Sequence, residues 1–255
     1  MTARQKILIV LHQEHSTPGR VGQRLCQRGY ELDVRRPRFG DPLPRTMAGH
    51  AGAVIFGGPM SANDDDDFIR RETDWIEVPL KEQKPFFGIC LGAQMLVRHL
   101  GGCVEAHPQG MVEIGYYPLE PTEAGRRLMD WPACVYQWHG DGMSVPAGAV
   151  ELARGDIFTT QAIQVGQNAF GIQFHTELTL AMLYRWTTLA AHRLKDPGAR
   201  PRAEHFSGRF MHDRAASDWL DRFLDLWLPR QAKSAPAVEK GSCGLSIPIA
   251  ASPSL

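Results

Sequence analysis

Short hydrophobic runs in the first hundred residues alternate with polar or glycine-rich stretches. The runs are continuous and rich in β-branched or aromatic residues, which is the pattern of strands buried on both faces of a parallel sheet. Strands are predicted at 6–11, 30–35, 52–56 and 85–89. Helices are predicted between and after them, at 20–28, 67–82 and 91–100. This order predicts an α/β fold with helices layered on a mostly parallel sheet.

The second half of the chain has a different pattern. Short apolar runs separated by glycine and proline predict strands and hairpins. These strands are expected at 112–119, 133–139, 149–153, 162–165 and 169–174. A long helix is expected at 178–195 and a final amphipathic helix at 215–228. Residues 1–230 are therefore predicted to form a single domain. Residues 231–255 have few apolar anchors and are predicted to be a disordered tail.

Charge and cysteine content narrow the class of protein. Lys plus Arg and Asp plus Glu number 28 each, which argues against a nucleic-acid or membrane-surface partner, since both favour a basic excess. The five cysteines are odd in number and form no C-x-x-C pair, so neither a disulfide framework nor a structural zinc site is expected. A reduced, cytoplasmic protein is predicted. The apolar run at 6–11 is too short to span a membrane.

A candidate nucleophile lies between a predicted strand and a predicted helix. The segment 88–92 reads Gly-Ile-Cys-Leu-Gly, the G-x-C-x-G form of a nucleophile elbow centred on Cys90. A helix N-terminus favours a thiolate there, and the backbone N–H of Leu91 could contribute to an oxyanion hole. The alternative is that Cys90 is a small core residue, as many free cysteines are.

A candidate base follows the last predicted strand. His175 comes directly after the apolar segment 169–174, and Glu177 lies two positions later. Residues i and i+2 of an extended chain point to the same side, so Glu177 could hold one ring nitrogen while the other faces Cys90. A histidine after a strand is, in isolation, more often a surface or capping residue.

Four blocks together resemble the class I glutamine amidotransferase family, the module found in GMP synthase and in stand-alone proteins. They are Gly57-Gly58-Pro59, Gly88 to Gln94, Trp138-His139-Gly140-Asp141, and Gly171 to Glu177. The blocks occur in the family's order, and the resemblance covers roughly residues 6–195. It implies a three-layer open sheet with a flavodoxin-like core. Thr176 departs from the family, which usually has proline there.

The resemblance also implies a role for each matched residue. Cys90 would attack the glutamine side-chain carbonyl, His175 would act as base and acid, and Glu177 would orient His175. The N–H groups of Gly58 and Leu91 would form the oxyanion hole. The substrate-binding residues would be Gln94, His139, Gly140 and Asp141. No metal or cofactor is implied.

Alternatives remain for the biological role. The sequence contains no P-loop and no S-G-G-x-D-S nucleotide loop, so a glutaminase module that supplies ammonia to a separate synthetase subunit is expected. A self-sufficient hydrolase of γ-glutamyl amides or peptides is the main alternative. A non-catalytic regulatory module and a cysteine peptidase or chaperone-like member of the wider superfamily are less favoured. The acidic run 64–67 and the histidine-bearing segment 200–213 are expected to be surface features.

Overall fold

The computed structural model describes residues 4–228, so the tail predicted at 231–255 lies outside the described residues. The strands are β1 (Lys6–Val10), β2 (Glu31–Arg35), β3 (His50–Ile55), β4 (Phe86–Ile89), β5 (Val104–Ala106), β6 (Glu113–Pro118), β7 (Glu120–Pro121), β8 (Cys134–His139), β9 (Asp141–Met143), β10 (Ala149–Arg154), β11 (Thr160–Val165) and β12 (Ala169–Ile172). The helices are α1 (Gly19–Gln27), η1 (Pro37–Phe39), α2 (Asp67–Trp75), α3 (Glu77–Lys81), α4 (Leu91–His99), α5 (Glu123–Leu128), α6 (Leu180–Leu189), η2 (Ala191–Lys195) and α7 (Arg202–Trp227).

A central sheet of eight strands organises the molecule, in the order β2-β1-β3-β4-β12-β11-β10-β7. The neighbours from β2 to β12 pair in parallel, and the remaining pairs are antiparallel. This confirms the predicted mostly parallel sheet. Two small antiparallel pairs, β5 with β9 and β6 with β8, lie beside it.

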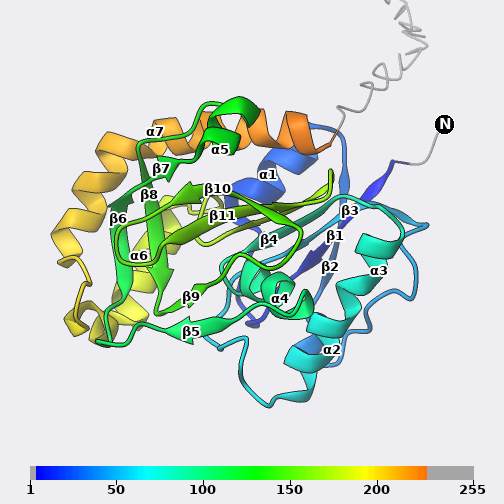
Figure 1. Cartoon of the computed structure of the whole chain (residues 1–255), viewed down its shortest axis with the longest axis horizontal. Helices are drawn as coiled ribbons and strands as arrows, with labels where there is room; N and C mark the ends of the chain where they lie inside the picture. Colours follow the sequence, from blue (N-terminus) through cyan, green and yellow to red (C-terminus); the bar gives the residue numbers. More distant parts are fainter. Residues whose placement is uncertain (1–3, 229–255) are drawn as a thin grey trace, which may run out of the picture.

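Helices cover both faces of the sheet, which gives the three layers visible in Figure 1. Side chains of a strand alternate between the two faces, and β1 shows this directly. Ile7 and Ile9 belong to the buried cluster that includes residues of α1 and α7, whereas Leu8 and Val10 belong to the cluster that includes residues of α2 and α4. A continuous apolar run is therefore needed here, because neither face of the strand meets water.

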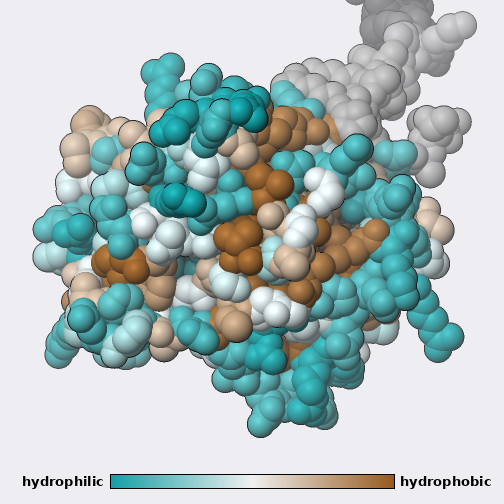
Figure 2. All heavy atoms as spheres, viewed as in Figure 1, coloured by the Kyte–Doolittle hydropathy of each residue, from teal (hydrophilic) through white to brown (hydrophobic). Residues whose placement is uncertain are grey.

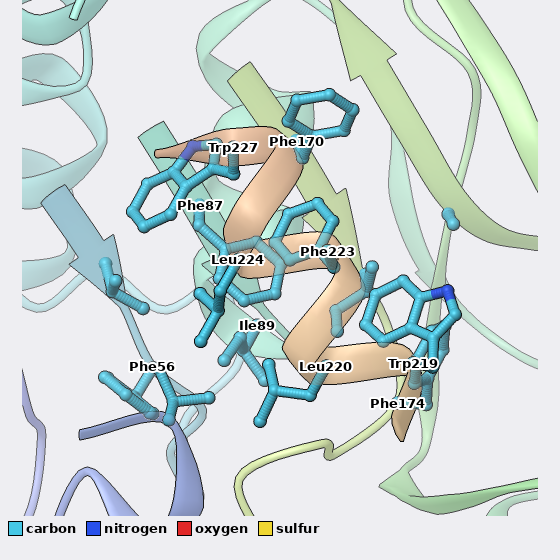
Figure 3. Close-up of a cluster of buried hydrophobic side chains, with 14 of the residues drawn as sticks. Phe56, Phe87, Ile89, Phe170, Phe174, Trp219, Leu220, Phe223, Leu224 and Trp227 are labelled. Atoms are coloured by element: carbon cyan, nitrogen blue, oxygen red, sulfur yellow. The ribbon is translucent and has the colours of Figure 1, made fainter. Parts of the chain in front are cut away.

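The last helix contributes the largest side chains of one core layer. Trp219, Phe223 and Trp227 recur at helical spacing, and Figure 3 shows them against Phe87 of β4 and Phe170 of β12. The Phe87 and Phe223 ring centroids are 4.6 Å apart. This packing anchors α7 directly over the two strands that precede the candidate site residues.

Three predicted helices differ from the observed ones. The helix expected at 67–82 divides into α2 and α3, because Pro79 lacks an N–H group and its ring opposes a continuous helical turn. The prediction of one helix at 178–195 was wrong in its second half. The chain leaves helical geometry at Ala190, with φ −109° and ψ 32°, and continues as η2. The final helix begins at Arg202, well before the predicted 215. The apolar pattern did not reveal its first half, because that half is polar and lacks a clear apolar stripe.

Segment 200–213 was expected at the surface, but two of its residues, His205 and Gly208, are buried. His205 is fully buried, where Nδ1 lies 2.9 Å from the Tyr136 hydroxyl oxygen and Nε2 lies 3.0 Å from the Arg200 carbonyl oxygen. Burial lowers the pKa of His205, so the ring is neutral and structural. The acidic run 64–67 is exposed as expected, at the start of α2.

The molecular surface shows a mixture of residue types. Figure 2 shows hydrophobic residues toward the middle of the face in view, with hydrophilic residues bordering them. Among residues 4–228, no helix combines the length and apolar character needed to cross a bilayer.

Candidate active site

Cys90 occupies a sharp turn between β4 and α4. Its backbone has φ 51° and ψ −107°, a conformation that L-residues rarely adopt and that marks strain maintained by the surrounding structure. The flanking glycines are required by close packing: a β-carbon on Gly88 would lie 2.5 Å from the Gly92 carbonyl oxygen, and one on Gly92 would lie 2.1 Å from the Ile55 carbonyl oxygen. The G-x-C-x-G pattern therefore corresponds to an elbow that no other residue at 88 or 92 would fit.

Pairing between β4 and β12 brings the candidate base to the candidate nucleophile. The strands run in parallel with Gly88 opposite Gly171 and Ile89 opposite Ile172. The register continues past the strand end, where the Cys90 N–H donates to the Ile172 carbonyl oxygen at 2.7 Å. A β-carbon on Gly57 would lie 3.0 Å from His175 Cε1 and 3.3 Å from Cys90 Cβ, so both side chains border the same point.

His175 and Glu177 form a buried ion pair. His175 Nδ1 lies 2.7 Å from Glu177 Oε1, and the two side chains are 5% and 3% exposed. Burial on its own lowers the pKa of His175, but the charge of Glu177 and the contact with the Cys90 sulfur outweigh burial and raise that pKa to about 10. The His175 ring is therefore held as an imidazolium beside the Cys90 sulfur at neutral pH.

The first helix fixes the position of Glu177. The Arg20 N–H donates to the Glu177 carbonyl oxygen at 2.8 Å. Gly19, at φ +50°, permits this approach, since a β-carbon there would lie 2.2 Å from the same oxygen. Thr176 and Glu177 form a turn. Threonine therefore permits a turn at the position where the family usually has proline.

A second buried His–Glu pair lies behind the Gly57–Gly58 turn. His12 Nε2 is 2.8 Å from Glu72 Oε2, His12 Nδ1 is 3.1 Å from the Gly57 carbonyl oxygen, and both side chains are fully buried. A planar trans peptide directs the C=O of Gly57 and the N–H of Gly58 to opposite sides. The His12 contact thus constrains the direction of the Gly58 N–H group.

The Asp141 backbone is held by three side chains. Its carbonyl oxygen accepts from Gln94 Nε2 and Gln173 Nε2 at 3.0 Å, and His139 Nδ1 lies at 3.0 Å from it. His139 Nε2 in turn lies 3.0 Å from Glu113 Oε2, with both side chains almost wholly buried. The predicted substrate-binding residues thus lie together beside one pocket. The side chains of Gln94 and His139 contact the Asp141 backbone.

Two pockets meet at Cys90. The first, of about 210 Å³, lies on the side of His175 and Glu177 and is bordered by Ser16, Arg185 and Trp186 among others. The second, of about 410 Å³, lies on the side of Gln94 and Asp141. Gly58 and Trp138 border both pockets. A bound molecule could therefore have one part on each side of the thiol.

Several of these residues give no signal in the sequence. His12 and Glu72 are single polar residues in separate elements, and Glu113, Gln161 and Gln173 form their buried network only through the fold. Gln173 was within a recognised block but was assigned no role. In the described part of the chain, no cluster of three or more His, Cys, Asp or Glu residues could hold a metal ion.

Comparison with known proteins identifies the family. The sequence profile described as glutamine amidotransferase class-I matches residues 13–183. The chain belongs to the class I glutamine amidotransferase family. It is 30% identical over 185 residues to YfeJ, a glutamine amidotransferase-like protein of Salmonella typhimurium, covering 69% of this chain and 77% of that protein.

Further relatives include a glutamine-hydrolyzing GMP synthase and solved structures of glutamine amidotransferases. The chain is 31% identical over 141 residues to the glutamine-hydrolyzing GMP synthase of Porphyromonas gingivalis, but this match covers 53% of the chain and 26% of the synthase. A glutamine amidotransferase structure from Methylobacillus flagellatus is 25% identical with a TM-score of 0.82, covering 90% of this chain and 98% of that one. One from Thermotoga maritima is 26% identical with a TM-score of 0.78, covering 88% and 99%.

Proposed function

We propose that this protein hydrolyses the side-chain amide of glutamine, or of a related γ-glutamyl compound, through a thioester on Cys90. The observation that carries the proposal is the strained elbow that holds Cys90 against a buried His175–Glu177 pair. Acyl transfer to a cysteine requires three groups: a nucleophile, a base beside it, and an acidic side chain that orients the base. Membership of the class I glutamine amidotransferase family supports the same reaction.

In the first half of the proposed reaction, the Cys90 sulfur attacks the amide carbon as a thiolate paired with the His175 imidazolium, and a C–S bond forms. Negative charge moves to the carbonyl oxygen, where the N–H groups of Gly58 and Leu91 would donate to it. His175 then gives a proton to the departing nitrogen as the C–N bond breaks, and ammonia leaves. The pKa of about 10 for His175 supports this role, because the ring carries the needed proton at neutral pH.

In the second half, water attacks the thioester carbon while His175 accepts its proton. The C–S bond breaks, the Cys90 thiolate and the His175 imidazolium form again, and the new carboxyl group loses its proton to solvent as glutamate leaves. Glu177 would keep the imidazole in one orientation through both halves by its 2.7 Å contact with Nδ1. Gln94, His139, Gly140 and Asp141 would hold the substrate from the larger pocket. His139 would act through the Asp141 backbone that it contacts.

Two fates of the ammonia are compatible with this chemistry. The similarity to glutamine-hydrolyzing GMP synthases favours transfer of ammonia to a separate synthetase subunit. The pocket of about 210 Å³ on the His175 side is larger than ammonia needs, which favours the second candidate, a self-sufficient hydrolase of γ-glutamyl amides with a larger leaving amine.

Glutamate release from glutamine and from a panel of γ-glutamyl amides tests the proposal, with Cys90→Ala as the control. Cys90→Ala and His175→Ala are expected to abolish hydrolysis and to leave the circular dichroism spectrum unchanged. Full activity in folded Cys90→Ala protein would refute the assignment. Faster turnover of a γ-glutamyl amide than of glutamine would select the self-sufficient hydrolase.

A further inference from the structure

The larger pocket carries complementary charges at its rim. Asp141 supplies a carboxylate and Arg193 supplies a permanently charged guanidinium, and both border the pocket that also contains Cys90 and Gln94. The free end of glutamine is an α-amino acid, with one ammonium and one carboxylate. The pocket therefore offers one group of opposite sign for each charge of that end.

The guanidinium of Arg193 lies beside the Gly140 backbone in the wall of this pocket. Its Nε lies 2.5 Å from Asp196 Oδ2, which fixes the plane of the fork. A β-carbon on Gly140 would lie 3.4 Å from Arg193 Nη2, so the guanidinium covers the Gly140 backbone. Among residues 4–228, no acceptor is bonded to the two Nη groups. The Nη donors thus remain available for a carboxylate, which arginine binds with paired hydrogen bonds.

Asp141 is arranged in a similar way. The Ser61 hydroxyl donates to Asp141 Oδ2 at 2.7 Å, and the backbone carbonyl is held by Gln94 and Gln173. Within the described residues, no donor is bonded to Asp141 Oδ1. A substrate ammonium could therefore be bound by Oδ1.

Arg193 comes from η2, beyond the segment 13–183 that matches the family profile. The chain reaches the pocket because α6 ends at Leu189 and turns at Ala190, so that Ala190 and Arg193 both border it. A continuous helix would have directed this segment elsewhere. The cation is thus a feature of this chain's own C-terminal part rather than of the matched blocks.

We propose that Arg193 binds the α-carboxylate of the substrate and thereby discriminates against compounds that lack this group. The proposal rests on the proposed hydrolysis of glutamine at Cys90. An internal glutamine residue has no α-carboxylate, because that group is part of the next peptide bond. Arg193 would then contribute to binding rather than to the chemical step.

Three amides that differ by one group provide the test: glutamine, glutaramate, which lacks the ammonium, and 4-aminobutanamide, which lacks the α-carboxylate. We expect Arg193→Gln to raise KM about 10- to 100-fold for glutamine and glutaramate, the range for losing a hydrogen bond to a charged group. The kcat should change little, and ammonia release from 4-aminobutanamide should not change. Lys195→Gln is the matched control, because it removes a positive charge from the same segment without bordering the pocket.

A second measurement does not depend on turnover and can be used if the wild-type enzyme is slow. Alkylation of Cys90 by a chloromethyl ketone analogue of glutamine should slow in Arg193→Gln, whereas alkylation by iodoacetamide should not. Equal effects on both reagents, or no effect on either, would overturn the role of Arg193. Failure of the proposed function is a separate result, namely hydrolysis that persists in Cys90→Ala.

Discussion

Removing the charge of Glu177 tests the electrostatics of the site most directly. Glu177→Gln keeps the size of the side chain and an oxygen that could accept from His175 Nδ1, but it removes the charge that is the largest contribution raising the pKa of His175. Burial, which lowers this pKa, is then opposed mainly by the smaller contribution of the Cys90 sulfur. We expect the pKa of His175 to fall from about 10 toward its ordinary value of about 6.5.

The expected change is large enough to measure without ambiguity. A fall over the whole interval from about 10 to about 6.5 would correspond to about 5 kcal/mol between the two protonation states of the ring. The proton on ring carbon Cε1 of His175 can be followed by NMR from pH 5 to pH 11, and its resonance can be assigned by its loss in His175→Gln. Glu72→Gln is the matched control, since it removes a carboxylate from the separate buried pair with His12.

Two results would refute this reasoning. A midpoint near 10 in Glu177→Gln would mean that the charge of Glu177 does not hold the proton, and the same fall in Glu72→Gln would mean that the effect is not local. Stability offers an independent check. A raised histidine pKa contributes stability that is fully present below about pH 6.5 and lost as pH rises through about 10. The free energy of unfolding of the wild type should therefore fall across that window, and that of Glu177→Gln should fall much less.

Two further predictions concern supporting residues. His12→Ala should lower kcat for glutamine about 10- to 100-fold with little change in KM, because a loosened Gly57 carbonyl misdirects the Gly58 N–H. A rise in KM with unchanged kcat would contradict this prediction. Restoration of kcat by His12→Gln would support it. Trp219→Ala should destabilise the fold by about 3–5 kcal/mol in urea denaturation, since this side chain is fully buried in the layer beneath α7. A loss below 1 kcal/mol would show that α7 contributes little to the core.

The sequence predicted the sheet well because its buried parallel strands are continuous apolar runs with glycine or proline at their ends. β1, β3 and β4 were recognised on that basis, and the elbow at Cys90 followed from glycines that the structure shows to be sterically required. Short elements such as β9 were missed, because three residues carry too little periodicity to be distinguished from a loop.

The supporting residues could not be predicted for a different reason. Arg193 lies in a segment that was expected to be helical, and its position depends on the turn at Ala190 and on the Asp196 contact. His12 and Glu72 meet only after β1 and α2 pack together. Such contacts are made by the tertiary fold and leave no local pattern in the sequence.

The pairing of β4 with β12 has a consequence for how the protein acquires activity. The two strands are distant in sequence, and their register brings the segments that carry Cys90 and His175 together. Contacts between distant segments close long loops and form slowly during folding. Reactivity of the thiol should therefore appear late in refolding, after this parallel pairing, and a chain arrested before β12 docks would contain the elbow without its base.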